Sequence, residues 1–163
     1  MDSDTFTTKN EDKKEEKILN EREIANVLVH HLTNLGYQTK TEFVLNNSFF
    51  NIKQLTNKEI SKVRIDVAAV KDDKIVFIEV ENGLWATHPL IYRNFAHRVF
   101  LAYPAENENP TDEEQIKLAK SEGIGIIKVS TIGSITPLVK PLDYEIPLPL
   151  CNAIISLFNK KIK

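Results

Sequence analysis

The chain has 163 residues, the usual length of one domain. Hydrophobic residues make up 42% and charged residues 27%, a globular composition that excludes disorder throughout the chain. The single cysteine, Cys151, excludes an internal disulfide and any multi-cysteine metal site. The net charge of −2 argues against a surface coated in basic residues for non-specific nucleic-acid binding, although it allows a local basic groove.

The sequence also carries no signal for a membrane or for export. No apolar stretch approaches the roughly 20 residues that a membrane helix needs. The acidic start, Met1–Thr5, does not look like a signal peptide. We therefore expect no contact with a membrane and a cytoplasmic, reducing location.

The N-terminal part divides into an arm and a helix. Residues 1–14 are almost entirely polar and are expected to form a disordered arm, followed by a single domain over residues 15–163. From Glu15 onward, apolar residues recur at steps of three and four. This spacing predicts an amphipathic helix that ends at Gly36.

Three strands are predicted next, two of them joined by a tight turn. Gln38–Leu45 is the first, and residues 48–62 then fit no single pattern. Val63–Lys71 and Lys74–Glu81 are apolar on both faces, which is typical of central strands covered by helices. Because only Asp72–Asp73 separates them, they are expected to form an antiparallel hairpin.

The second half of the chain continues to alternate helices and strands. The spacing predicts a helix over Thr87–Ala96, a strand over Arg98–Tyr103, a helix over Thr111–Glu122, a strand over Ile124–Val129, an edge strand within Ile135–Ile146 and a C-terminal helix over Leu150–Lys163. Thr87 is expected to cap the first of these helices, and Thr111 with Glu114 the second. This order predicts an α/β fold, a mixed sheet flanked by helices.

Acidic residues interrupt the apolar hairpin. A two-residue turn places Asp66 directly opposite Glu79, with Cβ atoms ~4.5–5.5 Å apart, and Glu81 on the same face as Glu79. Like charges this close are destabilising unless one carboxyl keeps its proton or a cation lies between them. Mg²⁺ prefers such oxygen ligands, which makes a metal site one interpretation. Neutralisation of Asp66 by Arg64 is the other.

The segments Ile65–Val67 (IDV) and Ile78–Glu81 (IEVE), on adjacent strands after a helix and a strand, resemble the PD-(D/E)XK nuclease superfamily, which has the restriction-endonuclease-like fold. The resemblance covers residues 15–129 and implies an αβββαβ core, to which this chain adds a C-terminal helix. It also implies that Asp66 and Glu79 bind Mg²⁺ or Mn²⁺. In the family, the metal activates a water that cleaves a phosphodiester bond, here expected in DNA.

Two positions depart from the family pattern. Ile65 replaces the proline, a tolerated change, and Glu81 replaces the lysine that orients or activates the water. Some type II restriction enzymes of the superfamily carry this E-x-E variant and remain active, which gives Glu81 the role of general base or additional ligand. The alternative is a catalytically degenerate module that binds nucleic acid or a protein partner without cleavage.

The first helix offers a further acidic residue, as it does in many superfamily nucleases. Glu21 falls on the face defined by Ile24 and Leu28, so we expect it to complete the metal site, with Glu23 solvated. The alternative places Glu21 in an exposed first turn. Glu42, on the first strand, is a weaker candidate.

Five residues are candidates for nucleic-acid binding. His88 and Tyr92 share a helical face and loosely resemble the Q-x-x-x-Y helix that follows the catalytic strand in some superfamily nucleases. A core position for Tyr92 is the alternative. Lys62, Arg64 and Arg93 belong to a local group of basic residues suited to holding phosphates.

Two further features bear on partners. Trp85 follows the hairpin and is interpreted as a core anchor, with an exposed stacking residue as the alternative. Because many superfamily enzymes dimerise, the C-terminal helix is a candidate contact for a homodimer.

Overall fold

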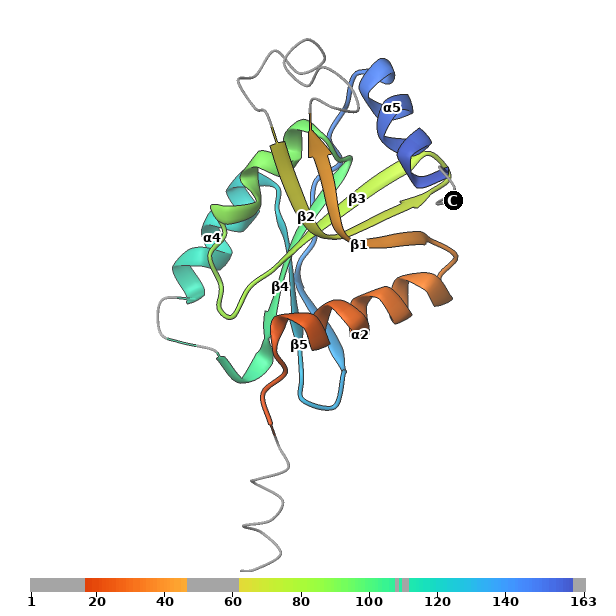
Figure 1. The fold of residues 1–163 in the computed structure, drawn as a ribbon. Helices are drawn as coiled ribbons and strands as arrows, with labels where there is room; N and C mark the ends of the chain where they lie inside the picture. Colours follow the sequence, from red (N-terminus) through yellow and green to blue (C-terminus); the bar gives the residue numbers. More distant parts are fainter. Residues whose placement is uncertain (1–16, 47–61, 108, 110–111, 160–163) are drawn as a thin grey trace, which may run out of the picture.

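The computed structural model describes residues 17–46, 62–107, 109 and 112–159, and these form a six-stranded sheet with helices on both faces (Figure 1). The elements are α2 (Glu21–Asn34), β1 (Gln38–Asn46), β2 (Lys62–Lys71), β3 (Lys74–Val80), η1 (His88–Asn94), β4 (Arg98–Pro104), η2 (Ala105–Asn107), α4 (Asp112–Glu122), β5 (Gly125–Val129), β6 (Ile135–Val139) and α5 (Leu148–Asn159). The predicted α/β class with a mixed, helix-flanked sheet is confirmed.

The strands follow one another across the sheet in chain order, β1 to β6. β1, β2 and β3 pair antiparallel, β4 lies parallel to β3, β5 lies parallel to β4, and β6 returns antiparallel. Parallel neighbours require a crossover connection. The one between β3 and β4 contains η1, and the one between β4 and β5 contains α4.

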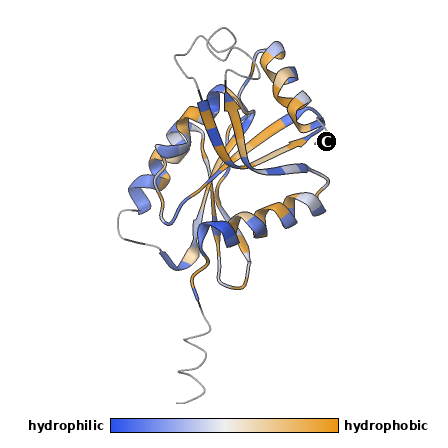
Figure 2. Cartoon of the chain, in the orientation of Figure 1, coloured by the Kyte–Doolittle hydropathy of each residue, from blue (hydrophilic) through white to orange (hydrophobic). Residues whose placement is uncertain are grey.

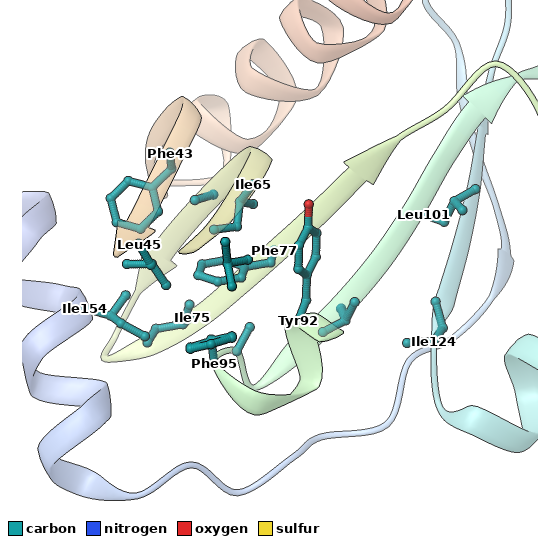
Figure 3. Close-up of a cluster of buried hydrophobic side chains, with 14 of the residues drawn as sticks. Phe43, Leu45, Ile65, Ile75, Phe77, Tyr92, Phe95, Leu101, Ile124 and Ile154 are labelled. Carbon is teal, nitrogen blue, oxygen red and sulfur yellow. The ribbon is translucent and has the colours of Figure 1, made fainter. Parts of the chain in front are cut away.

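Each face of the sheet has its own core. On one face, Ile24 and Leu28 of α2 are buried against a cluster that includes Val67 and Ile78. On the other face, η1, α4 and α5 cover a larger cluster centred on Phe77, shown in Figure 3. The central strands are apolar along their length, whereas the helices carry hydrophilic residues on their outer sides (Figure 2). This double coverage explains why the predicted hairpin is apolar on both faces.

The turn between β2 and β3 has two residues, as predicted. Asp72 and Asp73 both have positive φ, 52° and 63°, the conformation of the type I′ turn that matches the twist of a hairpin. Next to the turn, Lys71 pairs with Lys74, and the pairing continues along the strands to Val67 with Ile78. The predicted register is therefore confirmed over these pairs.

Two predicted helices differ from those observed. α2 begins at Glu21 rather than Glu15, because Asn20 accepts a bond from the Glu23 backbone N–H while the Glu23 carboxylate accepts one from Asn20. The helix expected at Thr87–Ala96 is the 3₁₀ helix η1, and the Thr87 side chain makes no capping bond.

The remaining boundaries are close to those predicted. α5 begins at Leu148, two residues before the expected start. Gly36 ends α2 as predicted, with a φ of +94° that favours glycine. The predicted arm over residues 1–14 and the cap at Thr111 lie outside the described residues. None of the described helices is long and apolar enough to cross a lipid bilayer.

We predict that replacing Asp72–Asp73 with Asn-Gly raises the free energy of unfolding by about 0.5–1 kcal/mol, because these residues tolerate the two positive φ angles better. Urea denaturation measures the change. The control is Glu114→Gly in α4, where glycine lowers helix stability by about 1 kcal/mol. An Asn-Gly variant less stable than the native chain would contradict the turn assignment.

Candidate active site

The candidate site lies where β2 and β3 part. Their pairing ends at Val67 with Ile78, one position before Asp66 and Glu79. The sequence predicted that Asp66 pairs directly opposite Glu79, but the ladder does not extend to this pair. Instead its Oδ2 atom accepts a hydrogen bond of 2.8 Å from the Val80 backbone N–H. The carboxyl thus satisfies a backbone group that the ladder leaves open and is held between the two strands.

The backbone around Asp66 departs from regular strand alternation. Ile65 and Ala68 pack in the larger cluster, whereas Val67 packs in the cluster on the α2 side. In a regular strand, Ile65 and Val67 would share a face. On neighbouring β1, Glu42 has a φ of +50°, a conformation uncommon for a non-glycine residue. Such backbone irregularity costs stability and is concentrated at functional sites.

Glu79 lies against Asp66, and its pKa is raised. Burial is the main cause, and the hydrogen bond to Asp66 and the negative charge of Asp66 act in the same direction, which together bring the pKa of Glu79 to about 8. Two ionised carboxylates cannot hydrogen-bond to each other, because each offers only acceptors. The raised pKa therefore favours a protonated Glu79 carboxyl, which is one of the two ways to relieve the repulsion.

Tyr92 supports Glu79 from the core. Its side chain is only 3% exposed, and its ring meets that of Phe77 edge-on at 5.8 Å between centroids. Its hydroxyl lies 2.7 Å from the Arg64 carbonyl oxygen and 3.1 Å from Glu79 Oε1. Figure 3 shows this hydroxyl projecting beyond the apolar cluster. The prediction that Tyr92 contacts nucleic acid is corrected, because the ring is buried and the hydroxyl faces Glu79.

A pocket of about 440 Å³ opens beside these carboxyls. Residues of α2, β1, β2 and β3 line it, namely Glu21, Arg22, Ala25, Asn26, Thr41, Glu42, Arg64, Asp66 and Val80. Because the capping box delays the start of α2, Glu21 is an exposed residue of the first turn. Partial burial and then the charges of Asp66 and Glu81 raise the pKa of Glu21. Glu21 is thus in electrostatic contact with both hairpin acids.

The predicted basic contacts separate into two groups. Arg64 lines the pocket, and its guanidinium bonds Glu42 Oε1 at 2.7 Å rather than neutralising Asp66. Lys62 is exposed at the start of β2. Arg93 turns toward α4 and pairs with Glu122 Oε2 at 2.8 Å, away from the pocket, and its contact with phosphate stays a prediction.

Glu81 lies just beyond the end of β3 and pairs with His88. The His88 Nδ1 atom lies within hydrogen-bonding distance of the Glu81 carboxylate. The Glu81 backbone N–H bonds the Ala102 carbonyl at 3.0 Å, so the residue is held beside β4. The negative charge of Glu81 also raises the pKa of Glu79. The structure therefore brings His88 into the acidic group, through Glu81.

Three polar residues of the pocket, Arg22, Asn26 and Thr41, were not among those expected from the sequence. Arg22 and Asn26 are four residues apart and therefore share a helix face with each other. The position of Arg22 and Asn26 close to Glu21 in the sequence could have identified them as residues of the same pocket. The predicted face was instead defined by apolar residues, which point to the core.

The donor set suits a hard divalent cation. Asp66, Glu79 and Glu21 offer carboxylate oxygens, the atoms that Mg²⁺ and Mn²⁺ prefer. In the described part of the chain, no three His, Cys, Asp or Glu side chains are already grouped as a metal-binding cluster. A cation bound between Asp66 and Glu79 would relieve the same repulsion that raises the pKa of Glu79. The chemistry of these side chains thus fits a hard cation, whose binding requires Glu79 to lose its proton.

No family model and no curated protein matches the chain. Among solved structures, it is similar to SPO1766, a protein of unknown function from Silicibacter pomeroyi, with a TM-score of 0.61 and 16% identity over 88% of this chain and 86% of that one. AF1548, also of unknown function, gives a TM-score of 0.45 and 18% identity over 64% of this chain and 55% of that one. SfsA from Pyrococcus furiosus, solved with Ca²⁺, gives 0.32 and 11% over 75% and 61%. The first similarity shows a shared fold, and none assigns an activity.

We predict that, in the absence of divalent cations, stability falls as the pH rises from about 4.5 to about 8. The folded chain keeps the Glu79 proton across this range, whereas the unfolded chain releases it near the ordinary pKa of 4.5. Glu79→Gln carries no such proton and is expected to be more stable than the native chain at pH 8. Urea denaturation in EDTA at pH 5 and 8 measures the difference, with exposed Glu145→Gln as the control. A Glu79→Gln variant with the native pH slope would contradict the raised pKa of Glu79.

A second prediction concerns the hydroxyl of Tyr92, whose hydrogen bond lowers the pKa of Glu79. In Tyr92→Phe, we expect the pKa of Glu79 to rise and the free energy of unfolding to fall by about 1–2 kcal/mol. Carboxyl ¹³C NMR follows the titration, and Tyr37→Phe serves as the control. An unchanged Glu79 titration would show that the hydroxyl does not act on this carboxyl.

Proposed function

We propose that the protein is a divalent-metal-dependent nuclease that hydrolyses phosphodiester bonds in DNA. Asp66 and Glu79 are the metal ligands in this proposal, with Mg²⁺ or Mn²⁺ as the cofactor. Glu21 and Glu81 complete the acidic group around them. The similarity of the segments IDV and IEVE to the PD-(D/E)XK superfamily supports the same assignment.

One observation carries the proposal. Asp66 lines an open pocket, and beside it the Glu79 carboxyl of the adjacent strand has a pKa raised to about 8. Burying an acidic pair lowers the stability of a fold. Strongly perturbed pKa values are concentrated at functional sites, where such a cost serves the activity. The pair therefore supports a site built to exchange its proton for a cation at neutral to alkaline pH.

The proposed roles follow from the surroundings of each side chain. Asp66 and Glu79 would hold the metal, which would supply a water of lowered pKa and neutralise charge on the scissile phosphate. The Val80 N–H fixes the Asp66 carboxyl, and the Tyr92 hydroxyl contacts that of Glu79. Arg64, with Arg22 beside it, supplies the positive charge of the pocket that suits a phosphate backbone. Glu81 accepts a proton from the attacking water in this scheme.

A second function is favoured by the state of Glu81. Its carboxylate is engaged by His88 and stands where the superfamily has a lysine. This arrangement supports a degenerate centre that binds nucleic acid without cleavage. The two functions differ in their response to EDTA, because only cleavage requires the divalent cation.

We predict that the native chain cleaves DNA in Mg²⁺ or Mn²⁺ and that Asp66→Asn and Glu79→Gln each lower the rate by about 100-fold or more. Single-stranded and duplex DNA are incubated at pH 8, with EDTA as the metal-free arm. Glu145→Gln, which changes an exposed carboxyl in the same way, is expected to cleave at the native rate.

Metal binding has its own measurement. Mn²⁺ is expected to raise the Tm of the native chain and to leave that of Asp66→Asn unchanged, since a ligand of the folded state stabilises it. Cleavage that persists in Asp66→Asn would refute the assigned ligands. DNA binding that is unaffected by EDTA, together with no cleavage in either cation, would establish the second function instead.

A further inference from the structure

We propose that Trp85 and His88 form a stacking platform for an unpaired nucleobase beside the acidic site, so that the substrate is a single-stranded nucleic acid or a single-stranded end. This inference rests on the proposed function and names its substrate class. It is carried by the position, the exposure and the anchoring of the two rings.

Trp85 is exposed, contrary to its interpretation as a core anchor. Half of its surface is open to solvent, and it is the only aromatic side chain among the large exposed hydrophobic residues of the described chain. Its ring is stacked on His88, with 6.3 Å between the ring centroids and 24° between the planes. Exposed aromatic rings held in this way are the surfaces on which nucleobases stack.

The loop that carries Trp85 is fixed on both sides. The Gln115 side chain of α4 accepts a hydrogen bond of 2.8 Å from the Ala86 backbone N–H. The Asn107 side chain donates one of 2.6 Å to the Asn82 carbonyl. Leu84 and Ala86, which flank Trp85, are buried in the core. The indole is therefore held outward by a packed loop, which lowers the entropy lost when a ligand binds.

The platform is continuous with the proposed active site. His88 contacts Trp85 on one side and the Glu81 carboxylate on the other. Glu81 in turn follows Val80, which lines the pocket and donates its backbone N–H to Asp66. A base stacked on Trp85 thus belongs to a nucleotide close to the one whose phosphate enters the pocket.

The chemistry of the platform favours an unpaired base. Stacking requires the open face of a base, and a duplex covers those faces with neighbouring pairs. Base–aromatic stacking does not depend on base identity, because every base has a π-face. The platform therefore distinguishes single-stranded from duplex nucleic acid, and it does not distinguish one base sequence from another.

The test uses the single tryptophan of the chain as the reporter. Native protein in EDTA, where the proposed cleavage is blocked, is titrated with a deoxythymidine oligonucleotide, its ribonucleotide equivalent, an abasic oligonucleotide of equal length and a blunt duplex. We expect saturable quenching of the Trp85 fluorescence by at least one base-bearing single strand, and little by the abasic strand or the duplex. The first two arms distinguish DNA from RNA.

A variant series measures the energetic contribution of the ring. Fluorescence anisotropy of a labelled single strand is expected to show about 10-fold weaker binding by Trp85→Ala and partial recovery in Trp85→Phe. Ile132→Ala, which removes another exposed apolar side chain, is expected to bind as the native chain does.

The outcomes separate the two proposals. Equal binding of abasic and base-bearing strands, absence of quenching, or native affinity in Trp85→Ala would overturn the stacking platform, whether or not the chain cleaves DNA. Quenching and selective binding without cleavage in any divalent cation would uphold the platform and refute the nuclease. These measurements need no catalysis, so a failure of either proposal is read independently.

Discussion

The contact between the Asp66 carboxyl and the Val80 backbone N–H organises the site. It forms where the β2–β3 ladder ends, and there the Val80 backbone N–H donates to a side chain in place of a ladder carbonyl. A carboxylate that accepts a backbone N–H is fixed in orientation. Glu79 is consequently brought against Asp66 rather than into solvent, and its pKa is raised. The fold therefore holds two acids together at the edge of the pocket.

Local sequence signals were sufficient for the framework around this contact. The pair Asp72–Asp73 is short enough to require a tight hairpin, and that turn sets the register that brings residues 66 and 79 near each other. The Asn20–Glu23 capping box is also recognisable in the sequence, although the apolar spacing alone predicted a helix start at Glu15. Boundaries depend on single hydrogen bonds such as these, whereas the elements themselves depend on spacing summed over many residues.

Other features of the site depend on contacts between distant segments, and no local pattern contains them. The positive φ of Glu42 and the interrupted alternation at Asp66 arise where β1, β2 and β3 meet. The partner of Arg93 is Glu122, 29 residues away, which a count of neighbouring basic residues does not reveal. Trp85 was interpreted as a core anchor because large aromatics are usually buried, and only the packed loop around it shows the ring turned outward.

The buried hydroxyl of Tyr92 couples the interior of the protein to the acidity of its surface pocket. Its ring is packed edge-on against Phe77, while its oxygen reaches both the Arg64 carbonyl and Glu79. A change in how the aromatic residues fit together therefore moves the hydroxyl whose hydrogen bond lowers the pKa of Glu79. Substitutions deep in this core, far from any substrate, will alter the proton affinity of the pocket as well as the stability of the fold. The packing of the aromatic core in this chain thereby influences the charge of the Glu79 carboxyl.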